Sequence, residues 1–327
     1  MMTASDTQTS PRLCVVVPCY NEQEVMTESA NQLTDVLKRL VEIGLVHDSS
    51  YVLFVDDGSK DETWSMIQEI ASNTRWVEGI KLSRNRGHQN AVFAGLNEGN
   101  GDIFISIDAD LQDDVSVIEK MVRNHVELNT DIVYGVRADR SSDSPFKRFT
   151  AEGYYRVLSL MGVEVVFNHA DFRLMSARAV RALGSYREVH LFLRGLVPLI
   201  GFKTAMIEYD RAQRFAGESK YPLRKMLSLA WEGITSFSAR PLRFIFIAGA
   251  TVSLLSFIAA AAAVIASFSG STIAGWASIM VMIAFLGGIQ LLSIGLIGEY
   301  IGKIYIEIKD RPRYFIDIRT DTEETQR

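Results

Sequence analysis

Short apolar runs alternate with longer amphipathic stretches through the first half of the chain. Each run is typical of a strand buried on both faces, and the stretches between them place apolar residues at helical spacing. Strands that alternate with helices imply an α/β domain with a mostly parallel sheet and right-handed crossovers. The predicted strands are 13–17, 51–55, 77–82, 103–107 and 132–137, and the predicted helices are 24–43, 88–97 and 115–128.

Beyond residue 137 the pattern is less regular. The loop at 214–221 gathers cations, a hydroxyl group and a glycine, a composition suited to binding an anion. A plain basic loop beside a membrane would have the same composition. The elements expected here are a polar loop at 139–145, a helix at 146–161, a further helix from about residue 177 and an edge strand at 203–209.

Two long runs near the C-terminus carry no charged residue. Residues 244–268 and 274–298 each exceed the ~20 residues that cross a bilayer as a helix. A pair of buried core helices is the alternative, but two such runs in succession favour a transmembrane hairpin. Arg240 and Arg243 precede the pair and further basic residues follow it, so the positive-inside rule places both ends in the cytoplasm.

An amphipathic helix is predicted before the first span. Residues 221–237 place apolar side chains at helical spacing and basic ones elsewhere, which suits a helix lying in the membrane interface. A core helix of the soluble domain would show the same spacing. The chain therefore divides into a disordered tail (1–10), a cytosolic domain (11–219), a juxtamembrane region (220–242), a membrane hairpin (243–302) and a cytosolic C-terminal tail (303–327).

Composition and charge exclude several classes of protein. The 327 residues have a net charge of −5, which argues against a nucleic-acid binder, and 48% apolar residues fit a chain that is partly in a membrane. Residues 1–10 are polar, so no signal peptide is predicted. Cys14 and Cys19 indicate reduced thiols of a cytosolic domain rather than a disulfide framework.

Polar residues recur where the predicted strands end. In a doubly wound sheet these ends share one edge, where ligands bind, so the set favours a nucleotide crevice. Each residue alone could belong to a solvated loop. The chain has neither a P-loop pattern nor a Gly-x-Gly-x-x-Gly opening a helix, which argues against both of those classes. The strand-end residues are Tyr20 and Glu22, Asp57, Arg84, Asp108 and Asp110, and Arg137.

The stretch Asp108-Ala109-Asp110-Leu111-Gln112 supplies the candidate metal site. Two carboxylates spaced i, i+2 at a strand end suit Mg²⁺ or Mn²⁺, ions that are commonly shared with substrate phosphates. An acidic pair at a strand end can also simply solvate a turn. Asp113 and Asp114 are interpreted as charges that open the following helix, and Ser59 is expected to cap the helix after residues 51–55.

Several motifs occur along the chain in a recognisable order. They are VVVPCYNE at 15–22, DDGS at 56–59, DADLQ at 108–112, GESKY at 217–221 and GEYIG at 298–302. With the two predicted spans, this pattern resembles the polyprenyl-phosphate glycosyltransferases of glycosyltransferase family 2. That group includes the dolichol-phosphate mannose synthases and the bactoprenol glucosyl transferases. The likeness extends from about residue 13 to residue 314. The two predicted spans and the motif Arg86-Gly87-His88-Gln89 make the chain most similar to the bacterial members of the group.

The resemblance implies a GT-A fold and inverting transfer of a sugar from a nucleotide diphosphate donor to polyprenyl phosphate. Mg²⁺ or Mn²⁺ would assist. The product would be a lipid-linked sugar for modifying cell-envelope glycans, made from undecaprenyl phosphate at the cytoplasmic face of a bacterial inner membrane. We expect a UDP-sugar, with GDP as the alternative, and the sugar stays open. Glycine-rich spans permit self-association, so a homo-oligomer is also left open.

The resemblance also assigns roles to individual residues. It implies that the base and ribose of the donor are bound by Pro18, Tyr20, Glu22 and Asp57. It implies that the metal and diphosphate are bound by Asp108, Asp110 and Gln112. Phosphates of donor or acceptor would be bound by Arg137, Arg214, Ser219 and Lys220. The catalytic set is Asp110, Asp171 and Arg137, and sugar contacts are expected from 168–173 and 191–196.

The chemistry of the acceptor bears on Asp171. A phosphate monoester is already ionised near neutral pH because its second pKa is about 6. A dedicated general base is therefore less necessary than for a hydroxyl acceptor, and Asp171 is either a base or a residue that positions the metal or sugar.

Two other functions remain to be weighed. One is an enzyme of the same fold with a saccharide acceptor, and the other is a non-enzymatic membrane scaffold or carrier. The chain lacks the Gln-x-x-Arg-Trp motif of processive synthases, and it has two predicted spans where such synthases have more. The acidic crevice would have no role in a scaffold.

Overall fold

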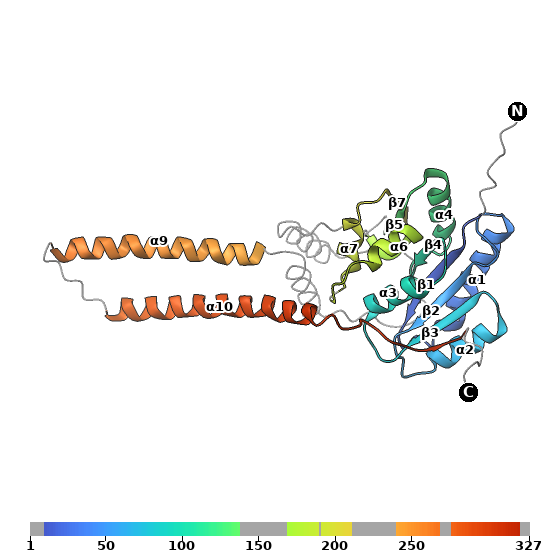
Figure 1. Cartoon of the computed structure of the whole chain (residues 1–327), viewed down its shortest axis with the longest axis horizontal. Coiled ribbons are helices and arrows are strands. Elements are labelled where there is room, and N and C mark those ends of the chain that lie inside the picture. Colours follow the sequence, from blue (N-terminus) through green and yellow to red (C-terminus); the bar gives the residue numbers. More distant parts are fainter. Residues whose placement is uncertain (1–9, 138–168, 190, 211–239, 269–275, 321–327) are drawn as a thin grey trace, which may run out of the picture. The chain divides into compact units, whose positions relative to one another are not determined.

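The computed structural model describes residues 10–137, 169–189, 191–210, 240–268 and 276–320. Contacts divide the chain into two compact units (Figure 1). The larger unit holds the sheet and includes the last segment of the chain, Arg311–Arg327, whereas the second unit holds two long helices. Several expected elements lie outside the described residues, namely most of the tail at 1–10, the helix at 146–161, the loop at 214–221 and the interfacial helix at 221–237.

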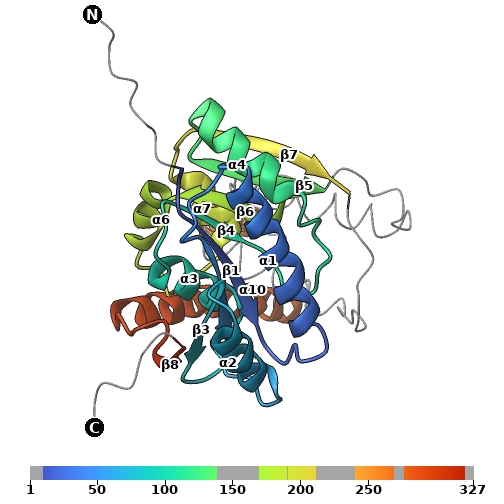
Figure 2. The ribbon, with the colours of Figure 1, turned by 90° about the vertical axis from the view of Figure 1, so that its right-hand side faces the viewer.

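The described strands of the larger unit form one eight-stranded sheet. They are β1 (Leu13–Cys19), β2 (Tyr51–Asp56), β3 (Val77–Leu82), β4 (Ile103–Ser106), β5 (Ile132–Arg137), β6 (His169–Ser176), β7 (Thr204–Tyr209) and β8 (Ile316–Arg319). Their order across the sheet is β7-β5-β6-β4-β1-β2-β3-β8 (Figure 2). The neighbours β4, β1, β2 and β3 are parallel, as predicted, and β7 is a parallel edge strand beside β5.

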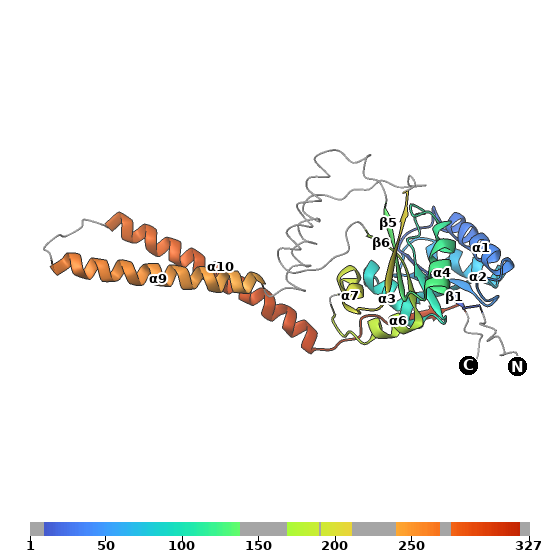
Figure 3. The same cartoon turned by 90° about the horizontal axis from the view of Figure 1, so that it is seen from above.

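Helices cover both faces of this sheet. They are α1 (Met26–Glu42), α2 (Thr63–Asn73), α3 (His88–Glu98), α4 (Val117–Leu128), α6 (Ala177–Gly184) and α7 (Leu193–Leu199). Helices α1, α2 and α4 lie on one face, and α3, α6 and α7 lie on the other (Figure 3). The central strands between them are apolar and buried along their whole length, which is why their sequences show no alternation.

The sheet is more mixed than the sequence pattern predicted. β6 runs antiparallel between β4 and β5, where no strand was expected. In β6, Asp171 and Arg173 alternate with Phe172 and Leu174, the period of a strand whose two faces differ. The apolar pair belongs to the main hydrophobic core, so the charged pair points to the opposite face. This strand therefore brings a buried charged pair to the carboxyl end of β4.

Two long helices form the described part of the second unit. They are α9 (Arg240–Phe268) and α10 (Trp276–Ile308), and they contact each other. α9 contains the first predicted span, and α10 extends well past the predicted end of the second span at residue 298. Among the described residues, Phe285–Ile308 is long and apolar enough to cross a bilayer, whereas Pro241–Val252 is a shorter apolar stretch. One candidate span is therefore found, and the second stays a prediction.

The chain returns to the sheet after α10. β8 pairs antiparallel with β3 and covers that edge of the sheet. The Tyr314 hydroxyl donates to Glu98 Oε1 at 3.0 Å, and Arg319 forms an ion pair with the same carboxylate. The guanidinium of Arg313 lies 4.4 Å from the ring centre of Phe93. The described part of the predicted C-terminal tail is thus the end of a helix followed by a strand of the sheet.

Candidate active site

The carboxyl ends of three strands meet at the edge of the sheet that the sequence predicted to bind a ligand. β1 lies between β2 and β4 and is parallel to both, so Asp57, after β2, and Asp108, after β4, lie along one edge. β6 begins at this edge because it runs antiparallel to β4. The Ser106 hydroxyl donates to the backbone oxygen of Asp171 at 2.6 Å, which places Asp171 beside the end of β4.

Asp57 joins two loops of the site. Its Oδ1 accepts the backbone N–H of Arg86 at 2.6 Å, and its Oδ2 accepts that of Gly87 at 2.8 Å. The side chain is buried, and burial raises the pKa of Asp57 while the two amides oppose that rise. Both carboxylate oxygens thus hold the loop that opens α3, and a contact of Asp57 with a nucleotide stays a prediction.

The other residues assigned to the nucleotide lie at the end of β1. Pro18 is buried within the strand, and Tyr20, just after it, exposes 40% of its surface. The backbone N–H of Glu22 donates to the Thr63 hydroxyl at 2.9 Å, which ties this loop to the start of α2. The three residues therefore border the same edge as Asp57, and their contacts with a nucleotide stay predictions.

The expectation that Ser59 caps the following helix is wrong. α2 begins at Thr63, whose backbone N–H donates to Asp61 Oδ1 at 3.1 Å rather than to Ser59. The Ser59 hydroxyl instead accepts the backbone N–H of Asn21 at 2.9 Å. Ser59 therefore links the loops after β1 and β2, because the chain makes a further turn before the helix starts.

Gly58 is required by this loop, and its replacement by alanine is expected to destabilise the protein. Gly58 has a φ of +70°, and a Cβ there would lie 2.7 Å from the backbone nitrogen of Asn85. Gly44 is a matched control because its φ is +68° and nothing lies within 4 Å of its Cβ position. Left-handed strain of about 1 kcal/mol applies to both alanine variants, and the backbone clash applies to Gly58→Ala alone. Thermal unfolding should show a clearly larger loss for Gly58→Ala, and equal losses would contradict the close contact.

The acidic stretch after β4 contains both site residues and structural ones. Asp113 is buried and accepts a hydrogen bond from the Tyr209 hydroxyl. Asp114 Oδ1 accepts the backbone N–H of Ser116 at 2.9 Å, just before α4. These contacts agree with the interpretation of both residues as structural charges near the start of the helix.

Asp108 and Asp171 flank the imidazole of His88. The His88 Nε2 atom lies 3.5 Å from Asp108 Oδ1 and 3.6 Å from Asp171 Oδ2. Burial, together with the neighbouring carboxylates, raises the pKa of Asp108 to about 6. Burial works to lower the pKa of His88, but its two carboxylate neighbours raise it above the ordinary value. His88 therefore offsets part of the negative charge that gathers at the end of β4.

Two arginines hold the carboxylate of Asp171. Arg173 is 1% exposed, and it donates to Asp171 Oδ1 at 2.7 Å and to the backbone oxygen of Leu193 at 3.4 Å. Arg194 donates from Nε to Oδ1 at 3.3 Å and from Nη2 to Oδ2 at 3.1 Å. Burial alone would raise the pKa of Asp171, but His88 and the two arginines hold it well below its ordinary value. Asp171 is therefore ionised at neutral pH.

The residues at the end of β4 fit a divalent cation. Asp108 and Asp110 offer carboxylate oxygens, and the amide oxygen of Gln112 is buried with no hydrogen-bond partner among the described residues. The described ranges contain no group of three or more His, Cys, Asp or Glu side chains arranged to hold a metal. Few protein ligands, all of them oxygen, suit Mg²⁺ or Mn²⁺ that completes its coordination with substrate phosphates and water.

Of the four residues assigned to phosphates, the structure describes Arg137. Arg137 ends β5, and β6 separates that strand from β4. Arg214, Ser219 and Lys220 lie outside the described residues. Their roles at the site remain predictions.

The structure adds His88, Arg173 and Arg194 to the site. His88 opens α3 directly after the loop that follows β3, so the rule that functional residues follow strand ends could have found it. The two arginines lie in the segments expected to contact the sugar, 168–173 and 191–196. Their spacing in the sequence does not show that they share one carboxylate, because that contact depends on β6.

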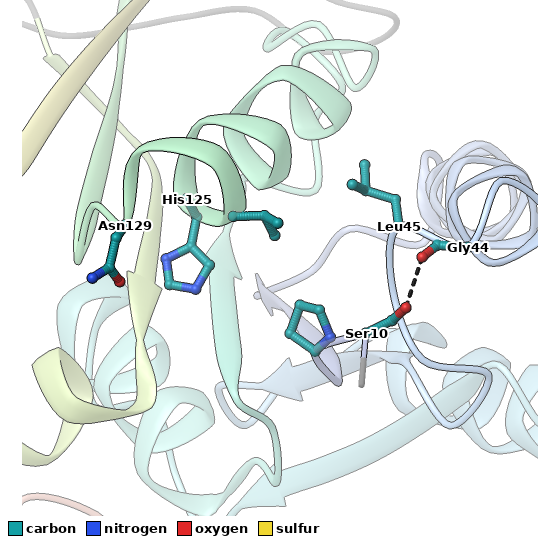
Figure 4. Close-up of a pocket in the computed structure, with 7 residues that line it drawn as sticks. Ser10, Gly44, Leu45, His125 and Asn129 are labelled. Carbon is teal, nitrogen blue, oxygen red and sulfur yellow. Dashed lines mark hydrogen bonds between the residues drawn. The ribbon is translucent and has the colours of Figure 1, made fainter. Parts of the chain in front are cut away.

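A hollow of about 490 Å³ lies at the opposite end of the strands from the candidate site. Its lining residues precede β1, follow α1, or lie in the last turn of α4 and just after it, which places them at the amino ends of the strands, away from Asp108. The Ser10 hydroxyl donates to the backbone oxygen of Gly44 at 2.7 Å across it. The hollow is therefore separate from the candidate site, and Figure 4 labels its residues Ser10, Gly44, Leu45, His125 and Asn129.

An α/β sheet covered on both faces, with carboxylates at the carboxyl edge of its central strands, defines an enzyme domain of the nucleotide-binding kind. Comparison with known proteins gives the family. Residues 14–184 match the model of glycosyl transferase family 2, and residues 240–304 match the GtrB C-terminal hairpin. The chain belongs to glycosyl transferase family 2, so it is a glycosyltransferase with a GT-A domain, and the resemblance seen in its motifs is confirmed.

Relatives match over almost the whole chain. The glycosyltransferase YkoT of Bacillus subtilis is 52% identical over 313 residues, which cover 95% of this chain and 93% of that protein. The SfII prophage-derived bactoprenol glucosyl transferase of Shigella flexneri is 39% identical over 310 residues, covering 93% and 97%. Among solved structures, the mannosyltransferase PcManGT from Pyrobaculum calidifontis in complex with GDP-Man and Mn²⁺ has a TM-score of 0.49 at 17% identity, covering 94% of this chain and 90% of that one.

Proposed function

We propose that this glycosyltransferase transfers a sugar from a nucleotide diphosphate sugar to a polyprenyl phosphate, giving a lipid-linked sugar for cell-envelope glycans. The observation that carries the proposal is the acidic pair Asp108 and Asp110 at the sheet edge, in a chain whose C-terminal part matches the GtrB hairpin. The Shigella flexneri relative, named as a bactoprenol glucosyl transferase, supports a lipid acceptor. A saccharide acceptor is less well supported, because that hairpin would then have no role in binding the acceptor.

Asp108 and Asp110, with Gln112 beside them, are the residues that would hold Mg²⁺ or Mn²⁺. The ion supplies positive charge that stabilises the departing nucleoside diphosphate. Pro18, Tyr20 and the other residues at the end of β1 would surround the base and ribose of the donor. The burial of the Asp57 carboxylate under the backbone of the α3 loop supports a role in shaping that nucleotide pocket.

Asp171 acts in this proposal as a positioning residue rather than as a general base. Both of its carboxylate oxygens accept hydrogen bonds from arginines, and its pKa is held well below the ordinary value. A strongly stabilised carboxylate is a weak proton acceptor. The phosphate acceptor is ionised near neutral pH and needs no base, so the low basicity of Asp171 does not obstruct the reaction.

The membrane arrangement belongs to the same proposal. α9 and α10 would cross the inner membrane as a hairpin, with the catalytic domain in the cytoplasm and Arg137, Arg214, Ser219 and Lys220 near phosphates of the substrates. The apolar length of Phe285–Ile308 supports at least one span. A site beside the bilayer is where a polyprenyl phosphate presents its charged head group.

A transfer assay with labelled donors tests the proposal. Purified full-length protein should move label from one of several UDP- or GDP-sugars into lipid that an organic solvent extracts, provided that polyprenyl phosphate is present. Chelation with EDTA should lower this rate by at least about 100-fold, because the charge of the leaving group is then no longer offset, and excess Mg²⁺ or Mn²⁺ should restore it. Failure of every donor to label lipid would overturn the proposed acceptor, and full activity in EDTA would overturn the metal role.

A further inference from the structure

We infer that His88 is a positioning residue that orients Asp108 toward the metal ion, an inference that rests on the proposed function. His88 is the first residue of α3, and its side chain is 42% exposed. Its Nε2 atom lies between two carboxylates, 3.5 Å from Asp108 Oδ1 and 3.6 Å from Asp171 Oδ2. One nitrogen atom thus connects a residue that we assign to the metal with a second carboxylate of the site.

Asp171 is the fixed side of this connection. Arg173, which is buried, donates to its Oδ1 at 2.7 Å, and Arg194 donates to both of its oxygens. Its backbone oxygen accepts the hydroxyl of Ser106 at 2.6 Å. Side chain and backbone are both held, so Asp171 gives the imidazole of His88 a well-defined position.

Asp108 is held less firmly than Asp171. Its Oδ1 faces His88, and within the described ranges no hydrogen bond reaches either oxygen of its carboxylate. Neighbouring carboxylates repel it, and both arginines of the site contact Asp171, so His88 is the described donor that contacts Asp108. Without that donor, repulsion would turn Asp108 away from Asp171 and move the oxygen offered to the ion. The ionisable groups around His88 and Asp108 are Asp57, Asp110, Asp113, Asp171, Arg173 and Arg194.

The contact requires a proton on Nε2 of His88 and does not depend on the charge of the ring. The imidazolium carries a proton on this atom, and so does one tautomer of the neutral ring. A lone pair facing two carboxylates would be repelled by both of them, so Nε2 serves here as a donor and not as a ligand of the ion. His88 therefore acts on the metal through Asp108, whose Oδ2 remains for the ion, as hydrogen-bonding partners of ligating carboxylates do.

The motif Arg86-Gly87-His88-Gln89 fixes the place of the ring from two sides. Its first two backbone N–H groups donate to the carboxylate of Asp57 at 2.6 Å and 2.8 Å. On the other side, Gln89 Oε1 accepts the backbone N–H of Leu193, the first residue of α7, at 3.1 Å. His88 is thus carried by a turn that is tied to the end of β2 and to α7, and its donor is in place before the ion binds.

Binding of Mn²⁺ to the full-length protein tests this inference. Electron paramagnetic resonance follows the free ion, with Mn²⁺ alone and with Mn²⁺ plus UDP or GDP. His88→Leu removes the N–H donor and should raise the dissociation constant of Mn²⁺ by at least about 10-fold, a loss typical for the partner of a metal ligand. His88→Gln can bring an amide N–H close to the position of Nε2 and should recover most of this affinity.

His47→Leu is the matched control. His47 is also an exposed histidine beside a carboxylate, with Nδ1 at 3.0 Å from Asp48 Oδ1, but it precedes β2 and so lies at the amino ends of the strands. This variant should bind Mn²⁺ as the unaltered protein does. Thermal unfolding of each variant checks that a loss of affinity is not a loss of folding.

The variant Asp108→Asn separates this inference from the proposed function. Unchanged or tighter binding of Mn²⁺ to His88→Leu, beside a loss in Asp108→Asn, would overturn the role of His88 and leave the metal site standing. Equal losses in His88→Leu and His88→Gln would also overturn it, because the N–H donor would then not matter. Normal binding in both His88→Leu and Asp108→Asn would refute the metal role itself. These constants require no turnover, so they can be read even if transfer to polyprenyl phosphate fails.

Discussion

Replacing Asp108 with asparagine is expected to lower the rate of sugar transfer by at least about 100-fold, because the amide keeps the shape of the side chain but brings no negative charge to the cation. Folding should not suffer. Burial and nearby carboxylates raise the pKa of Asp108 to about 6, above its usual value, so at neutral pH its carboxylate is ionised but destabilises the folded protein relative to the unfolded chain. Without metal, the melting temperature of Asp108→Asn should therefore equal or exceed that of the unaltered protein.

Asp114→Asn is the matched control for that experiment. Asp114 is exposed, and its Oδ1 accepts a backbone hydrogen bond that asparagine can also accept. Initial rates of transfer at saturating substrate should match those of the unaltered protein. If Asp108→Asn retained more than a tenth of the normal rate while Asp114→Asn behaved normally, Asp108 would lose the role assigned to it.

Replacing Arg173 with methionine is expected to produce the largest loss of stability. Arg173 is 1% exposed, and its removal leaves a buried carboxylate without its closest ion pair and the backbone oxygen of Leu193 without a donor. Breaking a buried pair from one side costs about 3–5 kcal/mol, and Arg194 still offsets part of the charge of Asp171. A loss of about 3 kcal/mol corresponds to a fall in melting temperature of roughly 6–12 °C for a domain of this size.

Arg178→Met supplies the comparison. Arg178 forms an ion pair with Asp131, but its side chain is 64% exposed, so solvent screens the interaction. Its melting temperature should fall much less than that of Arg173→Met, and Arg173→Lys should be intermediate because a single ammonium group cannot make both contacts of the guanidinium. Equal melting temperatures for Arg173→Met and Arg178→Met would show that burial does not set the strength of the Asp171 pair.

The central part of the fold could be predicted because its strands are buried on both faces. Runs such as 13–17 and 51–55 are wholly apolar, and covering both faces of a parallel sheet requires such runs. β6 could not be found in this way because its two faces differ, so charged residues interrupt its apolar ones. β8 is a short edge strand far along the chain from β3, its partner, and local pattern carries no information about such pairing.

The part of the site that lies just after the strands could be predicted from the sequence. Asp57 and Asp108 follow the two parallel strands that flank β1, so the topology alone brings them to one edge. The sequence did not predict that Asp171 would be held between Arg173 and Arg194, because these residues meet only when β6 and α7 pack together. The same packing supports our proposal that Asp171 positions other groups rather than accepting a proton.

The mass of the lipid product tests the central claim most directly. Full-length protein in nanodiscs would receive undecaprenyl phosphate, Mn²⁺ and the donor sugar nucleotide selected by the transfer assay, and extracted lipid would be analysed by mass spectrometry. The account predicts a lipid heavier by one sugar residue, with a single phosphate, and none of this product from Asp108→Asn. A lipid with two phosphates, label found only on free or polymeric sugar, or equal product from Asp108→Asn would contradict it.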